Sequence, residues 1–444
     1  MKDLIDKLKG DKVIWSFVAL LALFSFMPVF SASSNLAYLG HGTGNTLGYL
    51  VKHFAHICIG FLIIYWVHNI PYHYFRAISK AGLPLVWVLL FITLVKGTVI
   101  GGANASRWIQ IPFIGLSFQT STLAAIILFI FVARYLSKTR QEPITFKSSF
   151  IELWAPVFIT LGFILPGNFS TTALIFSMVI MLVFIGRYPI KYIFSIIGLA
   201  VLLLTFFVLI GKAFPQSKFF SRVGTWGSRI ESFTQDKPDE DDYQIEKAKI
   251  AIASGQIYGL GPGKSVQKNF LPQSSSDFIY AIIVEEYGLV GGLGVLVLYL
   301  LLLFRFVIAS HKANTLFGKL VVIGLGFPMI FQAMINMAVA VELLPVTGQT
   351  LPLISSGGSS IWMTCFGLGI ILSVTKKEEE IAQEKLEKEK REEILQKLID
   401  REIAADFEEG NVEKADFKNA NDNFDTNDYS ITDNSTNPMN AVLK

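Results

Sequence analysis

The stretch VIWSFVALLALFSFMPVF, which runs from Val13 to Phe30, contains no charged residue and decides the class of fold. A helix needs about 20 apolar residues to cross the roughly 30 Å of hydrocarbon in a bilayer. Because backbone polar groups in lipid must be paired within the protein, such runs form helices. Further runs of this kind begin near Val51, Ala77, Gln119, Phe150, Thr171, Lys191, Phe278, Leu316 and Ser359. The sequence therefore predicts an all-α polytopic membrane protein with about ten transmembrane helices.

The composition agrees with this prediction. Of the 444 residues, 52% are hydrophobic and only 16% are charged, and the mean hydropathy is +0.50. These values exclude a water-soluble enzyme. The net charge of +3 is too small to indicate a nucleic-acid partner. Cys58 and Cys365 both lie inside apolar runs, which leaves neither a disulfide framework nor a cysteine-rich metal site.

Basic residues in alternate short loops predict the orientation of the helices, because cytoplasmic loops are enriched in Lys and Arg. One side of the predicted bundle carries most of them, and both termini fall on that cytoplasmic side. Its basic residues are Arg76, Lys80, Arg134, Lys138, Arg140, Lys147, Arg187, Lys191, Arg305, Lys312 and Lys319. The outer side has only Lys52, Lys96 and Arg107 outside its one long loop.

The first apolar run has a second interpretation. It follows several lysines and ends at Ser31-Ala32-Ser33, which is typical of a signal peptide with a small-residue cleavage site. The run is longer than the usual apolar part of a signal peptide. A retained first helix also gives the even number of spans that the charge pattern requires.

Four regions are predicted along the chain. Residues 1–211 hold helices one to seven, and 212–276 form a large extracytoplasmic loop. Residues 277–375 hold the last helices with an outer re-entrant loop. Residues 376–444 form a charged cytoplasmic tail, partly disordered, for which a solvated helix and a docking element are the two interpretations.

The run Gly259-Leu-Gly-Pro-Gly263-Lys264-Ser265 is similar to the end of a phosphate-binding loop. The full pattern needs another glycine where this chain has Tyr258, and no strand precedes the run. It also falls on the outer side, away from cytoplasmic nucleotide. No nucleotide is therefore expected as a cofactor.

Asp277 stands at the outer mouth of the eighth predicted helix, after Ser274-Ser-Ser276. Ionisable groups in a membrane are costly and usually functional, yet this pattern also starts ordinary helices. Both interpretations stay open. Glu285 lies about 12 Å deeper, and Glu286 is on the opposite face of the helix, so neither can share a substrate atom with Asp277. Buried polar contacts between helices are the structural interpretation of these two acids.

Two other outer loops hold polar side chains. Arg107 and Trp108 are typical of an interfacial aromatic belt, although Arg107 breaks the charge bias. The connection from Pro345 to Ser360 is rich in glycine and hydroxyls. It is either a re-entrant loop that offers backbone N–H groups to an anion or a plain turn with a helix cap.

Taken together, these stretches resemble the SEDS family of shape, elongation, division and sporulation proteins, over most of the chain from Val13 to Thr375. Four ordered motifs carry the resemblance: Ser106-Arg107-Trp108-Ile109, Gly259 to Lys268, the block from Pro272 to Gly288 around Asp277, and Leu351-Pro352 with Ile354 to Ser360. The motif Gly-Pro-Gly-Lys-Ser-Val-Gln-Lys is more like the division members, FtsW, than the elongation members, RodA.

The resemblance implies a peptidoglycan glycosyltransferase that polymerises lipid II at the outer face of the bacterial cytoplasmic membrane, at the division septum. It implies that Asp277 is the catalytic carboxylate and that Arg107 and Trp108 are required. Lys96, Lys264 and Lys268 are further outer cations for the lipid diphosphate. The remaining candidates for substrate binding are Gln349, Ser355, Ser356 and Gly357.

The resemblance also implies partners: lipid II as substrate, a class B penicillin-binding transpeptidase and other membrane proteins of the division complex. It permits a divalent cation, Mg²⁺ or Mn²⁺, although no residue cluster in the sequence specifies a site and the metal ligands are unknown. The alternative functions are a lipid II flippase or other transporter, for which Glu285 and Glu286 are the candidate charges, and an elongation-type polymerase.

The chain departs from the family pattern at two places. Gln119-Thr-Ser-Thr122, followed by Ala125, replaces the usual Gln-Pro-Ser-Glu with a later Lys, and Pro166-Gly-Asn168 replaces the usual Pro-Asp-Leu. No site role is carried over to Thr122, Ala125 or Asn168.

Overall fold

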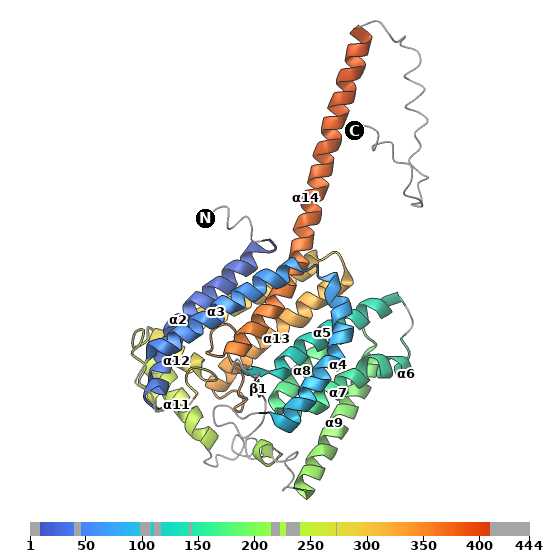
Figure 1. The fold of residues 1–444 in the computed structure, drawn as a ribbon. Coiled ribbons are helices and arrows are strands. Elements are labelled where there is room, and N and C mark those ends of the chain that lie inside the picture. The colour runs from blue at the N-terminus through green and yellow to red at the C-terminus, as the bar shows by residue number, and fades with distance from the viewer. Residues whose placement is uncertain are drawn as a thin grey trace. The chain divides into compact units, whose positions relative to one another are not determined.

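The computed structural model describes residues 9–39, 46–97, 108–110, 117–141, 144–214, 223–227, 240–271 and 273–408, some of them by backbone alone. The described chain is helical apart from one small pair of strands (Figure 1). Two compact units are present, Met1–Glu380 and Ile381–Lys444. The site lies in the first, and the four predicted regions of the chain remain predictions.

The apolar helices begin within a few residues of the predicted positions. They are α2 (Lys12–Leu39), α3 (Thr46–Asn69), α4 (His73–Lys96), α5 (Thr120–Lys138), α7 (Ala155–Ile164), α8 (Phe169–Ile185), α9 (Ile190–Ala213), α12 (Ile279–Lys312), α13 (Leu316–Ala340) and the first part of α14 (Gly358–Glu408). Shorter elements are η1 (Thr139–Gln141), α6 (Phe146–Ser149), the π-helical η2 (Phe150–Trp154), α11 (Glu240–Gly255) and η3 (Gln267–Asn269).

Among the described residues, nine helical segments are long and apolar enough to cross a membrane. One of them, Phe146–Ile164, joins α6, η2 and α7. The apolar helix α8 has 17 residues and is shorter than the other spans. The all-α polytopic fold is confirmed, whereas the exact number of spans and the large outer loop stay predictions.

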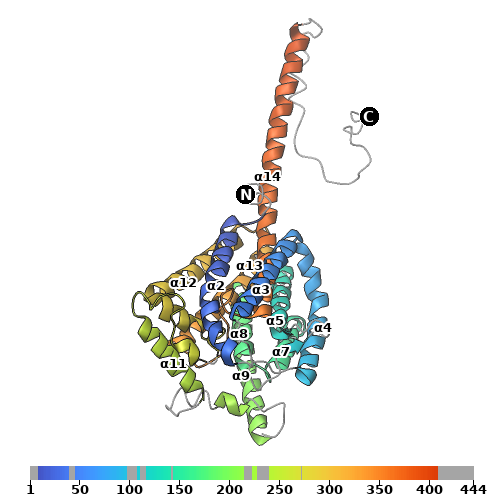
Figure 2. The same cartoon turned by 60° about the vertical axis from the view of Figure 1, so that its left-hand side comes forward.

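Helix α13 forms the centre of the bundle. It packs against α12 on one side and against α5 and α8 on the other, and α11 lies beside α12 (Figures 1 and 2). Most of its side chains are buried. Helix α9 is the opposite case: only 11% of its apolar window is buried, as expected for a helix that faces lipid.

The two short strands place the residues before α5. β1 (Trp108–Gln110) pairs antiparallel with β2 (Ser117–Gln119), and Trp108 lies opposite Gln119 in the register. Because β2 runs directly into α5, this pair fixes the Trp108 ring near the first turn of α5.

Helix α12 is interrupted at Gly288, whose φ of 69° and ψ of −170° are not helical. In an unbroken helix Leu289 N would donate to Glu285 O. Instead, the segment 256–261 pairs with the break on both sides. Four hydrogen bonds join the two segments: Leu260 N to Glu285 O (2.9 Å), Gly261 N to Glu286 O (2.9 Å), Leu289 N to Gln256 O (2.9 Å) and Val290 N to Ile257 O (3.2 Å). The backbone groups freed by the break are therefore paired, as a bilayer requires.

Candidate active site

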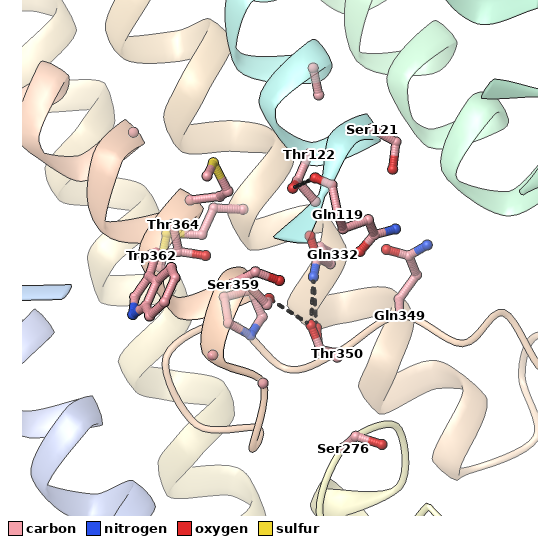
Figure 3. A pocket seen from close by; sticks show the side chains of 18 of the residues that line it. Gln119, Ser121, Thr122, Ser276, Gln332, Gln349, Thr350, Ser359, Trp362 and Thr364 are labelled. Carbon is pink, nitrogen blue, oxygen red and sulfur yellow. Dashed lines mark hydrogen bonds between the residues drawn. The ribbon is translucent and has the colours of Figure 1, made fainter. Parts of the chain in front are cut away.

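A cavity of about 580 Å³ opens among α3, α5, α8, α13 and the first turns of α14. This volume lies within the ~300–1,000 Å³ of typical ligand pockets. Many of its lining side chains carry hydroxyls or amides, which is unusual within a bundle of apolar helices (Figure 3). The polar residues labelled there are Gln119, Ser121, Thr122, Ser276, Gln332, Gln349, Thr350, Ser359, Trp362 and Thr364.

Asp277 lines this cavity from the turn 273–278, directly before α12, and is half-buried. It is the one carboxylate among the described lining residues. The N-cap residue of α12 is Phe278, which makes no side-chain capping hydrogen bond. Asp277 therefore lies one residue before the N-cap position of α12.

The backbone of Asp277 is held by Asn336 of α13. The side-chain nitrogen Nδ2 of Asn336 donates to the carbonyl oxygen of Asp277 and to that of Gln349, both at 2.7 Å. Asn336 is 1% exposed. Because α13 is one of the two most buried helices among the described spans, these bonds tie the turn and the loop before α14 to a rigid support.

Two serines join the same turn to the same loop. Ser355 Oγ donates to the carbonyl oxygen of Ser276 at 2.6 Å, and Ser356 N donates to that of Ser275 at 2.8 Å. The segments that the sequence marked around Asp277 and around Ser355 therefore form one unit, although about 80 residues separate them along the chain.

Amide and hydroxyl side chains continue the polar wall. Gln349 Nε2 donates to Thr171 Oγ1 of α8 at 3.0 Å, and Gln332 Nε2 donates to the carbonyl oxygen of Thr350 at 2.9 Å. Thr350 Oγ1 also lies 3.0 Å from Ser360 Oγ. Dashed lines in Figure 3 mark the bonds around Thr350. The wall can thus contact a polar group while its side chains stay fixed.

The structure brings together only some of the residues predicted from sequence. Asp277, Trp108, Gln349, Ser356 and Gly357 line the cavity. Ser355 is buried behind it and holds the turn.

The predicted cations are placed differently. Lys96, Lys264 and Lys268 do not line the cavity. The first two are exposed, and Lys268 Nζ donates to Ser31 Oγ at 3.2 Å and to the carbonyl oxygen of Gly263 at 2.9 Å. Arg107 lies outside the described residues.

Sequence reasoning missed a second group of lining residues. Lys52, His53 and His56 of α3 line the cavity together with Trp362 of α14. Lys52 was noted only as one of the few basic residues on the outer side. A lysine on the outer side, followed by histidines one and four residues later, was the signal that was available. Thr122 and Ala125, which depart from the family pattern, also line the cavity.

Glu285 and Glu286 are both fully buried and lie outside the cavity lining. The Glu285 carboxylate accepts hydrogen bonds from Ser265 Oγ, from Val266 N at 2.9 Å and from Gln267 N at 3.2 Å. Two backbone N–H groups directly after the Gly-rich run therefore bind an anion, as in a phosphate loop. That anion is a carboxylate of the same chain.

Glu286 makes the contact between helices that the sequence predicted. Its carboxylate accepts from Ser31 Oγ of α2 and from Ser265 N, the latter at 3.3 Å. With the bonds of Glu285, these contacts hold the run after α11 against α12 and α2, so both acids have a structural role.

A divalent cation needs several oxygen or nitrogen ligands held close together. The described residues contain no group of three or more His, Cys, Asp or Glu side chains that could hold a metal ion. Asp277 alone offers too few oxygen ligands for Mg²⁺ or Mn²⁺. The described part of the cavity does not fit a resident metal, and the divalent cation stays a prediction.

These features define a multi-spanning membrane protein with a carboxylate in a polar cavity between its helices. A sequence model of the FtsW, RodA and SpoVE family, described as "Cell cycle protein", matches residues 11–380. The chain belongs to this family of integral membrane proteins.

Similar proteins include two named "Probable peptidoglycan glycosyltransferase FtsW". The one from Nitrosomonas europaea is 30% identical over 82% of this chain and 92% of the relative. The one from Geobacter sulfurreducens is 30% identical over 82% of this chain and 95% of the relative. Stage V sporulation protein E of Bacillus subtilis is 26% identical over 83% of this chain and 98% of the relative.

Solved structures have the same fold. A chain of a peptidoglycan synthase complex that coordinates polymerisation and crosslinking matches with a TM-score of 0.63 at 24% identity, over 83% of this chain and 98% of that chain. Rod shape determining protein RodA of Thermus thermophilus matches with a TM-score of 0.59 at 22% identity, over 83% of this chain and 97% of that chain.

Proposed function

We propose that this chain is a peptidoglycan glycosyltransferase that polymerises lipid II into glycan strands at the outer face of the cytoplasmic membrane. The observation that carries the proposal is the position of Asp277, the one carboxylate among the described residues that line the cavity. The family and the names of the relatives support the same class of reaction.

In this mechanism Asp277 is a general base. Its carboxylate accepts the proton of the 4-hydroxyl of the acceptor GlcNAc, and the hydroxyl oxygen forms a bond to the anomeric carbon of the donor. The bond from that carbon to the diphosphate oxygen breaks, and the lipid diphosphate leaves as an anion. A diphosphate needs no protein acid to leave, so one carboxylate suffices, in contrast to the acid pair of glycosidases.

General base catalysis contributes about 10²- to 10⁴-fold. The remaining acceleration must come from holding both lipid-linked sugars in one cavity and from stabilising the negative charge that develops on the diphosphate. The fixed amides and hydroxyls of Gln332, Gln349 and Thr350 suit the first task, because they are held by the bonds described above.

The transporter hypothesis has lost the residues that supported it. Glu285 and Glu286 are bound to Ser265, Val266 and Ser31 and do not line the cavity. Ionisable groups on a transport path should be reachable by the substrate from both faces of the membrane.

The names of the FtsW relatives support a role in septal wall synthesis. Because glycan strands must be crosslinked, we further propose a single-span transpeptidase of the class B penicillin-binding type as partner, together with membrane proteins of the division complex. The solved relative that belongs to a complex for polymerisation and crosslinking is in keeping with this partner.

The experiment that tests the function supplies purified lipid II to the full chain in proteoliposomes, with and without the transpeptidase, and analyses the products on gels. We expect a ladder of glycan strands. Translocated lipid II without any polymer, under conditions in which a known polymerase is active, would favour the flippase instead.

A further inference from the structure

One wall of the cavity is built from the outer part of α3 and the beginning of α14. Lys52 and His56 lie one helical turn apart on α3. The His56 ring lies edge-on to Trp362, with ring centroids 5.2 Å apart. A Cβ atom on Gly358 would lie 2.5 Å from the His56 ring. The absence of a side chain at Gly358 therefore lets the His56 imidazole pack against the first residue of α14.

Four side-chain polar atoms of this wall are buried without a partner, His53 Nδ1 and three that lie where α3 meets α14. These three are Ser359 Oγ, Trp362 Nε1 and His56 Nδ1. Ser359 is 3% exposed and faces the cavity from the first turn of α14 (Figure 3). Because more than about 90% of buried polar groups are paired in folded proteins, three unpaired atoms where α3 meets α14 indicate a ligand that completes them.

The beginning of α14 adds backbone donors. Ile361 N donates to the carbonyl oxygen of Gly357 at 3.0 Å and so closes the first helical turn. The N–H groups of Gly358, Ser359 and Ser360 precede that bond and have no acceptor within the helix. The positive end of the helix dipole lies at the same place, which favours an anion.

The charged side chain of this wall is a cation, Lys52. Lys52 is the only Lys or Arg among the described residues that line the cavity. Trp362 Nε1–H can only donate, as can the backbone N–H groups. A sugar hydroxyl is recognised by donors and acceptors together, whereas a phosphate oxygen needs donors and positive charge. The wall therefore suits an anion better than a sugar.

We propose that Lys52, Ser359, Trp362 and the first N–H groups of α14 bind the diphosphate of a lipid-linked substrate. This inference rests on the proposed function, which supplies a lipid diphosphate as the leaving group. Lys52 thereby takes the role of cationic contact that the sequence suggested for Lys96, Lys264 and Lys268, which do not line the cavity. It also places positive charge in the same cavity as Asp277, where the departing anion forms.

The test uses the full chain in nanodiscs and three probes with the same short lipid tail: farnesyl diphosphate, farnesyl phosphate and farnesol. Affinity is measured by the change in tryptophan fluorescence. We expect the diphosphate to bind most tightly and farnesol most weakly. Equal affinity for diphosphate and farnesol would overturn the proposal, because the tail alone would then account for binding.

Variants locate the contact. Lys52→Gln should weaken binding of farnesyl diphosphate about tenfold, as expected for the loss of one charge-assisted bond. Ser359→Ala should weaken it several-fold. Lys212→Gln removes an exposed charge at the end of α9, outside the cavity lining, and should leave the affinity unchanged. Wild-type affinity in Lys52→Gln, or an equal loss in Lys212→Gln, would contradict the subsite.

A further pair of measurements separates this inference from the proposed function. Asp277→Asn should lose polymerisation yet keep its affinity for farnesyl diphosphate. A chain that makes no polymer but binds diphosphate through Lys52 would refute the function and retain the subsite.

Lipid II serves as the second ligand. If Lys52→Gln weakens the binding of lipid II but not the binding of farnesyl diphosphate, Lys52 contacts the sugar or the peptide, and the diphosphate assignment is wrong.

Discussion

The side-chain nitrogen of Asn336 lies 2.7 Å from the carbonyl oxygen of Asp277, and this bond connects the central helix α13 to the proposed catalytic turn. The same nitrogen donates to Gln349. Asn336 does not touch the reacting atoms in this account. Its role is to fix where the Asp277 carboxylate stands relative to the cavity.

Replacing Asn336 by Leu keeps the size of the side chain and removes both bonds. We expect kcat for glycan polymerisation to fall about tenfold to a hundredfold, because a shift of about 1 Å in a catalytic group has an effect of that order. KM should change less, since the cavity walls remain. Steady-state kinetics with lipid II measure both values.

Asn69→Leu is the matched control for this variant. Asn69 is exposed at the end of α3 and bonds only within its own helix and to Lys376. Its replacement should leave kcat unchanged. An Asn336→Leu enzyme with the kcat of the wild type would show that the turn needs no support from α13.

Gly288 allows a second prediction, about the break in α12. A Cβ atom there would lie 2.2 Å from the carbonyl oxygen of Ile257, and φ of 69° is unfavourable for any residue with a side chain. Gly288→Ala should therefore lower the thermal midpoint of the purified protein sharply, since the backbone conformation alone costs about 1–3 kcal/mol. Gly294→Ala, on the same helix and with nothing within 4 Å, should be neutral or stabilising by up to about 1 kcal/mol.

Hydrogen exchange then tests the pairing across the break. In Gly288→Ala the amides of Leu260 and Gly261 should exchange faster, because their acceptors on α12 move away. If Gly288→Ala and Gly294→Ala melt at the same temperature, the hydrogen bonds between segment 256–261 and α12 contribute nothing measurable to the stability of the fold.

Asp11 allows a third prediction, at the other end of the bundle. Its carboxylate accepts from Val13 N at 2.9 Å and Ile14 N at 3.3 Å, which caps α2, and from Arg305 Nε at 2.6 Å. Asp11→Ala leaves the helix uncapped and removes the partner of a guanidinium that is 25% exposed. We expect a loss of between about 1 and 3 kcal/mol of stability.

Thermal unfolding in detergent checks this value. The control is Glu393→Ala, which breaks an ion pair with Lys397 whose side chains are 66% and 71% exposed. Exposed pairs contribute little, so this variant should melt like the wild type. Equal melting of the Asp11 and Glu393 variants would mean that the Asp11 contacts do not stabilise the bundle.

Much of the fold was predictable because it follows from local sequence. The apolar runs near Phe278 and Leu316 gave the starts of α12 and α13 within one residue. Asp277 and Trp108 were found because short motifs mark them. In contrast, the wall of Lys52, His56 and Trp362 was missed, since its members are about 300 residues apart and meet only through helix packing.

The Gly-rich run before α12 was only half understood from sequence. Its similarity to a phosphate loop was set aside because Tyr258 stands where the pattern needs a glycine, yet the N–H groups of Val266 and Gln267, directly after the run, donate to the Glu285 carboxylate. The sequence showed the donors and the acid separately. The segment that leads to these donors pairs with α12 at the break at Gly288, which lies inside an otherwise apolar helical pattern.

In the proposed mechanism the Asp277 carboxylate accepts the proton of the attacking sugar hydroxyl. This proton transfer is tested most directly by measuring glycan polymerisation from lipid II by purified Asp277→Asn, with circular dichroism and thermal unfolding to confirm that the variant is folded. We expect a rate about 10²- to 10⁴-fold below that of the wild type. Glycan strands formed by the folded variant at the rate of the wild type would contradict this mechanism.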